Sequence, residues 1–96
     1  MYNLVISSAA TEMARHAYEW YDGQQLGLGS LFLSELDNTY RKLLANPLLY
    51  CKRYDDVRDV TISHFPYVLI YEVFGNEIVI YAIFHTSRRP DKKFRK

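Results

Sequence analysis

The feature that most restricts the fold of this chain is a pair of long apolar runs, residues 67–74 and 77–85, separated only by Gly75 and Asn76. β-branched and aromatic residues dominate both runs, and a two-residue loop that begins with glycine is typical of an antiparallel β-hairpin. Apolar side chains fill nearly every position instead of alternating with polar ones, which indicates strands that are covered on much of both faces. We therefore expect the hairpin to lie at the centre of a β-sheet.

Two helices are predicted ahead of this hairpin. The first has Ser8 as its N-cap and ends at Gly23, which is free to adopt a positive φ. Its apolar stripe at helical spacing consists of Ala10, Met13, Ala14, Ala17 and Tyr21. The second is predicted from Leu28 to Ala45 and stops at Asn46-Pro47, because proline disfavours helical dihedrals in the residue before it. Its predicted buried face holds Leu28, Leu31, Phe32, Leu36, Tyr40, Leu43 and Leu44.

Three shorter strands complete the predicted order of elements. Tyr2–Ser7 precedes the helices, and Tyr50–Tyr54 and Val57–Ser63 lie between the helices and the hairpin. The order β-α-α-β-β-β-β is typical of the α+β class, here an N-terminal helical hairpin packed on a mainly antiparallel, twisted sheet. A chain of 96 residues, 49% of them hydrophobic, is predicted to form one domain over residues 1–96.

The composition excludes several classes of protein. The sequence lacks an apolar run of the ~18 residues that a membrane-spanning helix needs, and its first residues lack the basic start of a signal peptide. We therefore expect a cytoplasmic protein with no membrane partner. Cys51 is the single cysteine, which indicates a small buried side chain and no internal disulfide. With three scattered histidines beside it, we predict no metal site and no cofactor.

The positive charge of the chain is concentrated at its C-terminus. Residues 85–96 contain six of the twelve Lys and Arg residues and one Asp, a net charge of +5, whereas residues 1–87 combine six basic with ten acidic residues. We expect this basic tail, residues 86–96, to attract a polyanion or an acidic protein surface. The alternative is a solvated tail that only keeps the protein in solution.

The order of elements and three local motifs resemble the ParE/RelE toxin superfamily, the toxins of bacterial type II toxin–antitoxin (plasmid stabilisation) modules. The motifs are Phe65-Pro-Tyr-Val-Leu-Ile-Tyr71, a last strand running into His85-Thr-Ser-Arg-Arg89, and Gly27-Leu-Gly-Ser-Leu-Phe32 before a helix that ends in Asn46-Pro47. The resemblance covers essentially the whole chain. It implies a small toxin neutralised by a cognate antitoxin in a hetero-oligomer, and the sequence leaves a homodimer open.

Members of the RelE-like branch resemble ribonucleases that cut messenger RNA on the ribosome. In-line attack of a 2′-hydroxyl needs a base, cations for the developing charge and an acid for the leaving oxygen. RelE-like members place basic residues on the sheet, where this chain has Asp59, Thr61 and Val68, and Phe94 stands in place of their C-terminal tyrosine. Only Arg88 matches. The comparison argues against a RelE-like active site.

The ParE-like branch resembles this sequence better. That resemblance implies inhibition of DNA gyrase by protein–protein contact, which traps cleaved DNA and requires no catalytic residue. An arginine pair, a proline and an aromatic residue recur in the tail of this branch, here Arg88-Arg89-Pro90 and Phe94. Arginine pairs in bidentate fashion and phenylalanine buries a large area at an interface. The predicted target-binding residues are His85, Arg88, Arg89, Lys92, Lys93, Phe94 and Arg95.

Two alternatives to a gyrase inhibitor stay open. The first is a ribosome-dependent endoribonuclease in which His64 or His85 has taken over the proton transfer, with His85 and Arg88 as its catalytic residues. The second is a non-toxic binding module derived from the same fold. Whether the chain is an enzyme is left undecided, with the non-enzymatic interpretation favoured.

A cluster of aromatic residues marks the end of the first predicted helix. Tyr18, Trp20 and Tyr21 either pack at the edge of the core or form an exposed aromatic surface for a helix of the antitoxin. Tryptophan and tyrosine are favoured anchors in protein interfaces. We therefore predict these three residues as antitoxin-binding.

Overall fold

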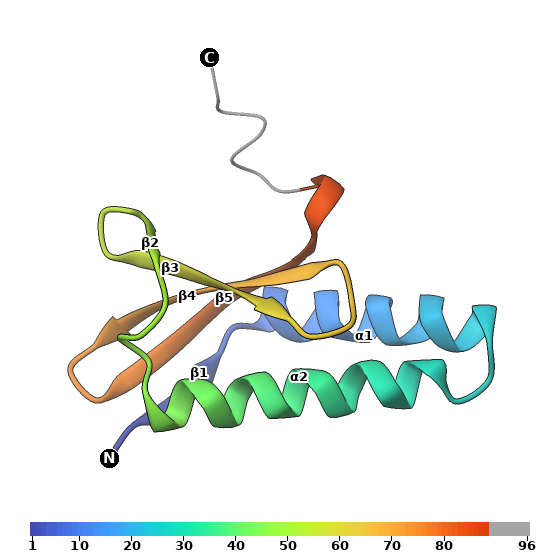
Figure 1. Ribbon diagram of the computed structural model, residues 1–96, viewed down its shortest axis with the longest axis horizontal. Coiled ribbons are helices and arrows are strands. Elements are labelled where there is room, and N and C mark those ends of the chain that lie inside the picture. The colour runs from blue at the N-terminus through green and yellow to red at the C-terminus, as the bar shows by residue number, and fades with distance from the viewer. Residues whose placement is uncertain (89–96) are drawn as a thin grey trace.

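The computed structural model of the chain describes residues 1–88, with side chains up to residue 87. Two antiparallel helices cover one face of a five-stranded sheet with the strand order β1-β5-β4-β3-β2 (Figure 1). β1 runs parallel to β5, and the other neighbours are antiparallel. The predicted class and element order are confirmed. The elements are β1 (Asn3–Ile6), α1 (Ser8–Gln24), α2 (Leu28–Ala45), β2 (Lys52–Tyr54), β3 (Val57–Ile62), β4 (Tyr67–Phe74), β5 (Glu77–His85) and the short 3-10 helix η1 (Thr86–Arg88).

The ends of α1 differ from the prediction. Ser7, not Ser8, is the N-cap, because its extended backbone leaves β1 and its side chain accepts a hydrogen bond from the backbone N–H of Ala10. The helix also continues through Gly23 to Gln24. The positive φ of 93° lies instead at Gly27, the N-cap of α2. Glycine adopts this dihedral without strain because it has no Cβ.

The second helix has the predicted bounds, but its buried face is narrower than predicted. Phe32, Leu36 and Leu43 lie in the core, whereas Leu31 and Leu44 are 50% and 37% exposed. The buried stripe is narrower than the apolar stripe of the sequence because a helix covered by only one layer buries only the side chains that point at that layer.

The two helices approach each other closely at Gly29. A Cβ added there would lie 2.6 Å from the backbone oxygen of Tyr18 and against its ring. The side chain of Asp22 fixes the link between the helices, because its Oδ1 accepts hydrogen bonds from the backbone N–H groups of Gly27 and Gly29. A small residue at this crossing is therefore a packing requirement.

The apolar hairpin lies inside the sheet, as predicted. β4 and β5 each have a strand on either side, and they are joined by Gly75-Asn76 with Gly75 at a φ of 59°. Their fully buried side chains form the centre of the core, namely Leu69, Tyr71, Ile78 and Ile80. β1 pairs with β5 only from Asn3↔Glu77 to Ile6↔Ile80, so the last part of β5 extends past the end of β1.

Other predicted boundaries shorten by one or two residues, since strand ends fray into turns. The first strand begins at Asn3 and ends at Ile6, and the strand after the helices begins only at Lys52. The prediction that Cys51 is buried is wrong, because this residue precedes β2 in an exposed position.

Candidate functional site: a groove between α1 and β5

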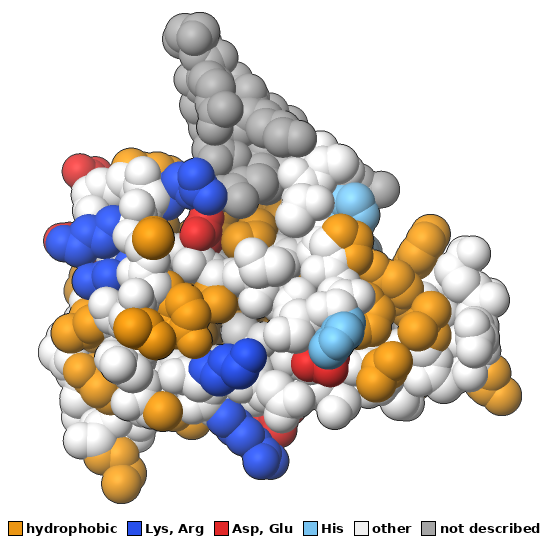
Figure 2. Space-filling view, viewed as in Figure 1, with side chains coloured by type: hydrophobic (Ala, Val, Ile, Leu, Met, Phe, Trp, Pro, Cys, Tyr) orange, Lys and Arg blue, Asp and Glu red, His pale blue; other side chains and the backbone are white. Residues whose placement is uncertain are grey.

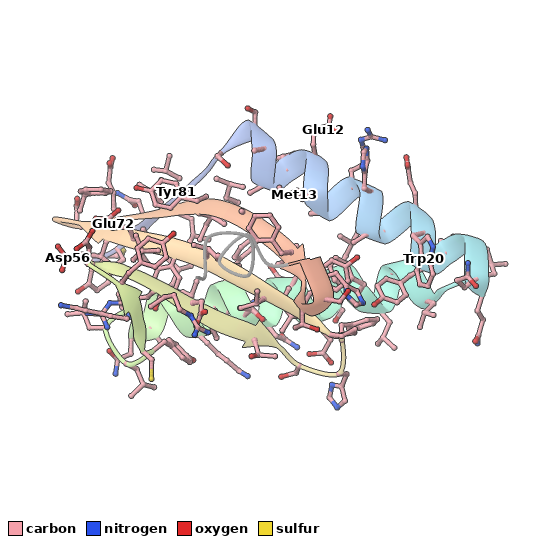
Figure 3. The ribbon with its side chains drawn as sticks, turned by 90° about the horizontal axis from the view of Figure 1, so that it is seen from above. Glu12, Met13, Trp20, Asp56, Glu72 and Tyr81 are labelled. Atoms are coloured by element: carbon pink, nitrogen blue, oxygen red, sulfur yellow. The ribbon has the colours of Figure 1, made fainter. Side chains whose placement is uncertain are left out.

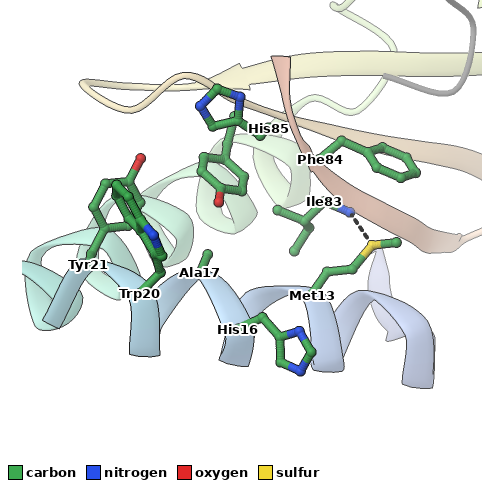
Figure 4. A pocket seen from close by; sticks show the side chains of 9 residues that line it. Met13, His16, Ala17, Trp20, Tyr21, Ile83, Phe84 and His85 are labelled. Atoms are coloured by element: carbon green, nitrogen blue, oxygen red, sulfur yellow. Dashed lines mark hydrogen bonds between the residues drawn. The ribbon is translucent and has the colours of Figure 1, made fainter. Parts of the chain in front are cut away.

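A groove forms where β1 ends and β5 continues. The backbone N–H and the hydroxyl of Ser7 donate to the carbonyls of Ile80 and Tyr81, each at 3.0 Å, and complete the β1 side of the sheet. Beyond this point the chain has turned into α1. The N–H of Ile83 therefore donates to the sulfur of Met13 at 3.4 Å (Figure 4). On the β1 side, the last residues of β5 thus lie beside helix α1 instead of beside a strand.

The groove has a volume of about 440 Å³. α1 forms one wall, and the other wall comes from the start of β4 and the end of β5 (Figure 4). Its lining is mainly apolar and aromatic, with an imidazole on each wall, which is suited to an amphipathic protein segment. The lining residues are Met13, His16, Ala17, Trp20, Tyr21, Tyr67, Ile83, Phe84 and His85.

An aromatic cluster anchors one end of the groove. Tyr21 is buried against Phe32 and Phe65 with ring centroids 5.6 and 4.8 Å away. Trp20 contacts the edge of Tyr21 but is 59% exposed. Burial raises the pKa of the Tyr21 phenol, and the neighbouring Tyr67 raises it further. Tyr21 is therefore a neutral, fixed support for a tryptophan that faces solvent.

His85 closes the groove at the end of β5. Its ring contacts the edge of Tyr67 at a centroid distance of 5.3 Å. Its Nδ1 accepts a hydrogen bond from the backbone N–H of Ser87 at 3.2 Å, so the neutral ring carries its proton on Nε2. η1 begins at the next residue and contains the backbone of Arg88. The remaining predicted target-binding side chains lie outside the described part of the chain: those of Arg88, Arg89, Lys92, Lys93, Phe94 and Arg95.

The groove brings together residues that the sequence had assigned to two different roles. Trp20 and Tyr21, predicted to bind the antitoxin, line the same space as His85, predicted to bind the target. Tyr18 is not part of the lining, and its ring packs beside Gly29 between the helices. Sequence reasoning missed six lining residues. Two of them, Met13 and Ala17, belong to the apolar stripe predicted for the first helix, but this pattern indicates burial and not a site. No pattern in the sequence indicates a site at the other four, which are His16, Tyr67, Ile83 and Phe84.

The face of the sheet turned away from the helices carries the positions at which RelE-like members are expected to place their catalytic residues. Asp59 and Thr61 pair with Ile70 and Val68, so these four residues share the face turned away from the helices. Both Nε and Nη2 of Arg53 donate to Asp59 at 2.8 Å. Arginine on this face is thus engaged with a carboxylate.

A second carboxylate lies on the same face. Tyr81 donates its hydroxyl hydrogen to Glu72 at 2.9 Å, and the two side chains lie side by side (Figure 3). Burial, followed by the hydrogen bond to Glu72 and its charge, raises the pKa of Tyr81, so this phenol is not a base at neutral pH. The charged contacts described on this face are thus an arginine paired with Asp59 and a phenol bonded to Glu72.

No group of three His, Cys, Asp or Glu side chains within residues 1–88 is arranged to hold a metal ion. No helix in this part of the chain is long and apolar enough to cross a membrane.

Several solved structures share this fold. A chain of the chromosomal ParDE toxin–antitoxin system from P. aeruginosa matches with a TM-score of 0.77 at 19% identity, covering 88% of this chain and 96% of that one. The isolated E. coli RelE toxin matches at 0.69 and 17% identity, covering 98% and 94%. The intact E. coli RelBE toxin–antitoxin complex matches at 0.66 and 18%, covering 86% and 94%. The architecture is therefore the one found in toxin–antitoxin systems.

The sequence narrows this class to one family. The model described as "ParE toxin of type II toxin-antitoxin system, parDE" matches residues 4–90. The chain belongs to the ParE toxin family, and the resemblance predicted from its motifs is confirmed. No curated relative matches the chain at a significant level.

Proposed function

We propose that this ParE-family toxin inhibits DNA gyrase in the cytoplasm by protein–protein contact, without cleaving a covalent bond itself. The observation that carries the proposal is the family match, which extends through Arg88, Arg89 and Pro90 at the start of the basic tail. The face of the sheet that would hold a ribonuclease site adds support. Its described side chains include Glu72, which would repel a phosphate, and Arg53, whose guanidinium is already engaged by Asp59.

A supercoiling assay tests this function. The purified chain is added to DNA gyrase and relaxed plasmid, and the topoisomers are separated on a gel. We expect supercoiling to be lost, and to be restored when Arg88 and Arg89 are both replaced by alanine. Arg15→Ala is the matched control, since Arg15 is an exposed arginine on α1 paired with Glu12 and Glu19. Undiminished supercoiling with a folded chain would contradict the proposal.

The ribonuclease alternative is tested by primer extension in a translating lysate. The match to RelE and the position of His85 beside the tail favour it as the second candidate. It requires new cleavage sites in messenger RNA that disappear in the His85→Ala and Arg88→Ala variants. If expression of the chain causes no growth arrest at all, the non-toxic binding module remains.

The α1–β5 groove is proposed to receive the cognate antitoxin, as an amphipathic helix or an extended segment. The exposed Trp20 on its buried aromatic support fits the pattern of an interface anchor, with large apolar area held in one orientation. A type II toxin requires an antitoxin partner, as in the ParDE and RelBE systems. The protein encoded by the neighbouring open reading frame is the first candidate partner to test.

The antitoxin site is tested by replacing Trp20. We expect Trp20→Ala to weaken binding of the neighbouring gene product by about 30-fold or more, the loss of one hot-spot residue. Leu26→Ala is the control, because Leu26 is a large apolar residue that is 90% exposed outside the groove. Equal affinity of the two variants would remove the groove from the antitoxin interface, without bearing on gyrase inhibition.

A further inference from the structure

The described part of the chain is strongly polarised in charge. Residues 41–58 carry five cations and two carboxylates, a net charge of +3. The rest of residues 1–87 carries one arginine and eight carboxylates, a net charge of −7. The cations come from the last turns of α2, from β2 and from the start of β3, which lie at one end of the molecule: Arg41, Lys42, Lys52, Arg53 and Arg58.

The same end carries exposed leucines. Leu44 lies in the last turn of α2, and Leu48 and Leu49 follow in the connection to β2. They are 37%, 54% and 67% exposed, and we call residues 44–49 the leucine turn. Figure 2 shows hydrophobic side chains gathered on the left of this face with Lys and Arg side chains around them. An exposed apolar group rimmed by charge is typical of a protein interaction site.

The leucine turn is held rigidly from below. The buried hydroxyl of Tyr71 donates to the carbonyl of Pro47 at 2.6 Å. Nη1 of Arg58 donates to the carbonyls of Tyr50 and Leu48 at 2.6 and 3.3 Å. These bonds tie the backbone of the connection to β3 and β4, so the backbone that carries the leucines is held in place. A partner that binds them pays little entropy for ordering the turn.

A hollow lies beside the turn. It measures about 360 Å³ and is large enough for apolar side chains of a partner. Val60 and Tyr50 contribute apolar surface to it, and its lining includes one cation, Lys42, and one carboxylate, Asp59, which is paired with Arg53. The hollow, unlike the groove between α1 and β5, is formed by α2, β3 and the connection before β2. The two sites share no residue: the hollow is lined by Lys42, Tyr50, Cys51, Asp59, Val60 and Thr61.

We propose that the leucine turn and its surrounding cations form a second docking surface, for a protein segment whose apolar side chains are flanked by Asp and Glu. With Asp37 and Asp59, which pair with Arg41 and Arg53, this end carries five cations and four carboxylates, a net charge of +1, whereas the rest of residues 1–87 carries −5. An acidic segment is therefore favoured at this end over the rest of the described surface. Arg41 and Lys52 pair with Asp37 and Asp56 in exposed positions, and such pairs contribute little to stability, so carboxylates of a partner can replace them. Nucleic acid fits less well, because phosphates gain nothing from exposed leucines.

This second docking surface is distinct from the proposed antitoxin site in the α1–β5 groove. A segment bound at the leucine turn leaves the groove at Trp20 and His85 open, because the lining residues do not overlap. The protein would therefore hold two protein segments at the same time. This property goes beyond gyrase inhibition and does not depend on it.

The proposal is tested by NMR on the ¹⁵N-labelled chain with two synthetic helical peptides. One peptide has leucines at helical spacing flanked by glutamates, and the other carries lysines in place of every glutamate. We expect the acidic peptide to shift the amide signals of Leu44, Leu48 and Leu49, and to bind about tenfold or more tighter than the basic one. The Leu48→Ser/Leu49→Ser variant should lose this binding by about tenfold or more, since both side chains are exposed anchors.

The controls decide between this proposal and its competitors. Leu26→Ser removes an exposed leucine from the other end of the molecule and should leave binding unchanged. Unaltered circular dichroism of the double variant excludes a folding defect. The proposal is overturned if both peptides bind equally, if the shifts centre on Trp20, or if a DNA duplex shifts the same amides while the acidic peptide does not.

Discussion

Replacing Tyr71 by phenylalanine tests how the leucine turn is fixed to the sheet. The Tyr71 side chain is 0% exposed, and its hydroxyl donates to the buried carbonyl of Pro47 at 2.6 Å. The substitution keeps the ring and removes only the donor, so the carbonyl loses its partner in a place that water does not reach. Loss of a buried hydrogen bond with one group left unsatisfied costs about 1–3 kcal/mol.

The expected loss is large enough to measure by thermal and chemical unfolding. With about 2 kcal/mol lost, and about 4–8 °C per kcal/mol for a domain of this size, the melting temperature falls by roughly 8–16 °C. Tyr81→Phe is the matched control, because its hydroxyl also donates a hydrogen bond, to Glu72 at 2.9 Å, but the residue is 38% exposed. That variant should stay within about 0.5 kcal/mol of the parent.

Hydrogen exchange adds a local measurement. The N–H of Leu49 donates to the carbonyl of Asn46 at 3.3 Å inside the turn, and its exchange should accelerate in Tyr71→Phe more than that of amides in α1. If Tyr71→Phe and Tyr81→Phe have the same stability, the hydrogen bond to Pro47 does not hold the turn. The leucine turn would then not be preformed by this hydrogen bond.

Two further predictions concern packing and pH. Gly29→Ala should destabilise the protein by about 1–3 kcal/mol, because the new Cβ would lie 2.6 Å from the backbone oxygen of Tyr18. Gly23→Ala should stabilise the protein by up to about 1 kcal/mol, because Gly23 lies in α1 with open space around it. Urea unfolding of the two variants checks these opposite signs. Burial raises the pKa of Tyr40 and of Tyr71 from 10.0 to about 12, so the folded state binds these protons more tightly and their contribution is complete below pH 10. The free energy of unfolding should therefore fall between pH 10 and about 12, less steeply in Tyr40→Phe, and an equal slope in that variant would refute the assignment.

The parts of the fold that follow from local signals could be predicted from the sequence. α2 begins after Gly27 and ends before Asn46-Pro47, and both signals act within a few residues of the helix ends. The β4–β5 hairpin is equally local, because Gly75-Asn76 sets the turn between its strands. The N-cap of α1 was misplaced by one residue because Ser7 and Ser8 are equivalent as sequence signals, and only the exit direction of β1 selects Ser7.

The groove could not be predicted, because it joins residues that are far apart in the sequence. Met13 and Ile83 are separated by 70 positions, and their contact depends on where β1 ends along β5. The exposure of Cys51 has a similar cause, since Arg58 and Tyr71 hold the connection before β2 on the outside of the sheet. The periodicity of the sequence also does not reveal that the connection before β2 is held to the sheet. The hydrogen bonds that hold it run from the side chains of Arg58 and Tyr71 to backbone carbonyls.

The measurement that tests the central claim most directly is the trapping of cleaved DNA. Gyrase and plasmid are incubated with the purified chain, stopped with detergent and protease, and the DNA is resolved on a gel. A non-hydrolytic inhibitor that acts on gyrase should produce linear plasmid only when gyrase is present, and none with Arg88 and Arg89 replaced by alanine. Intact plasmid in every lane, alongside new cuts in messenger RNA from a translating lysate, would contradict the account.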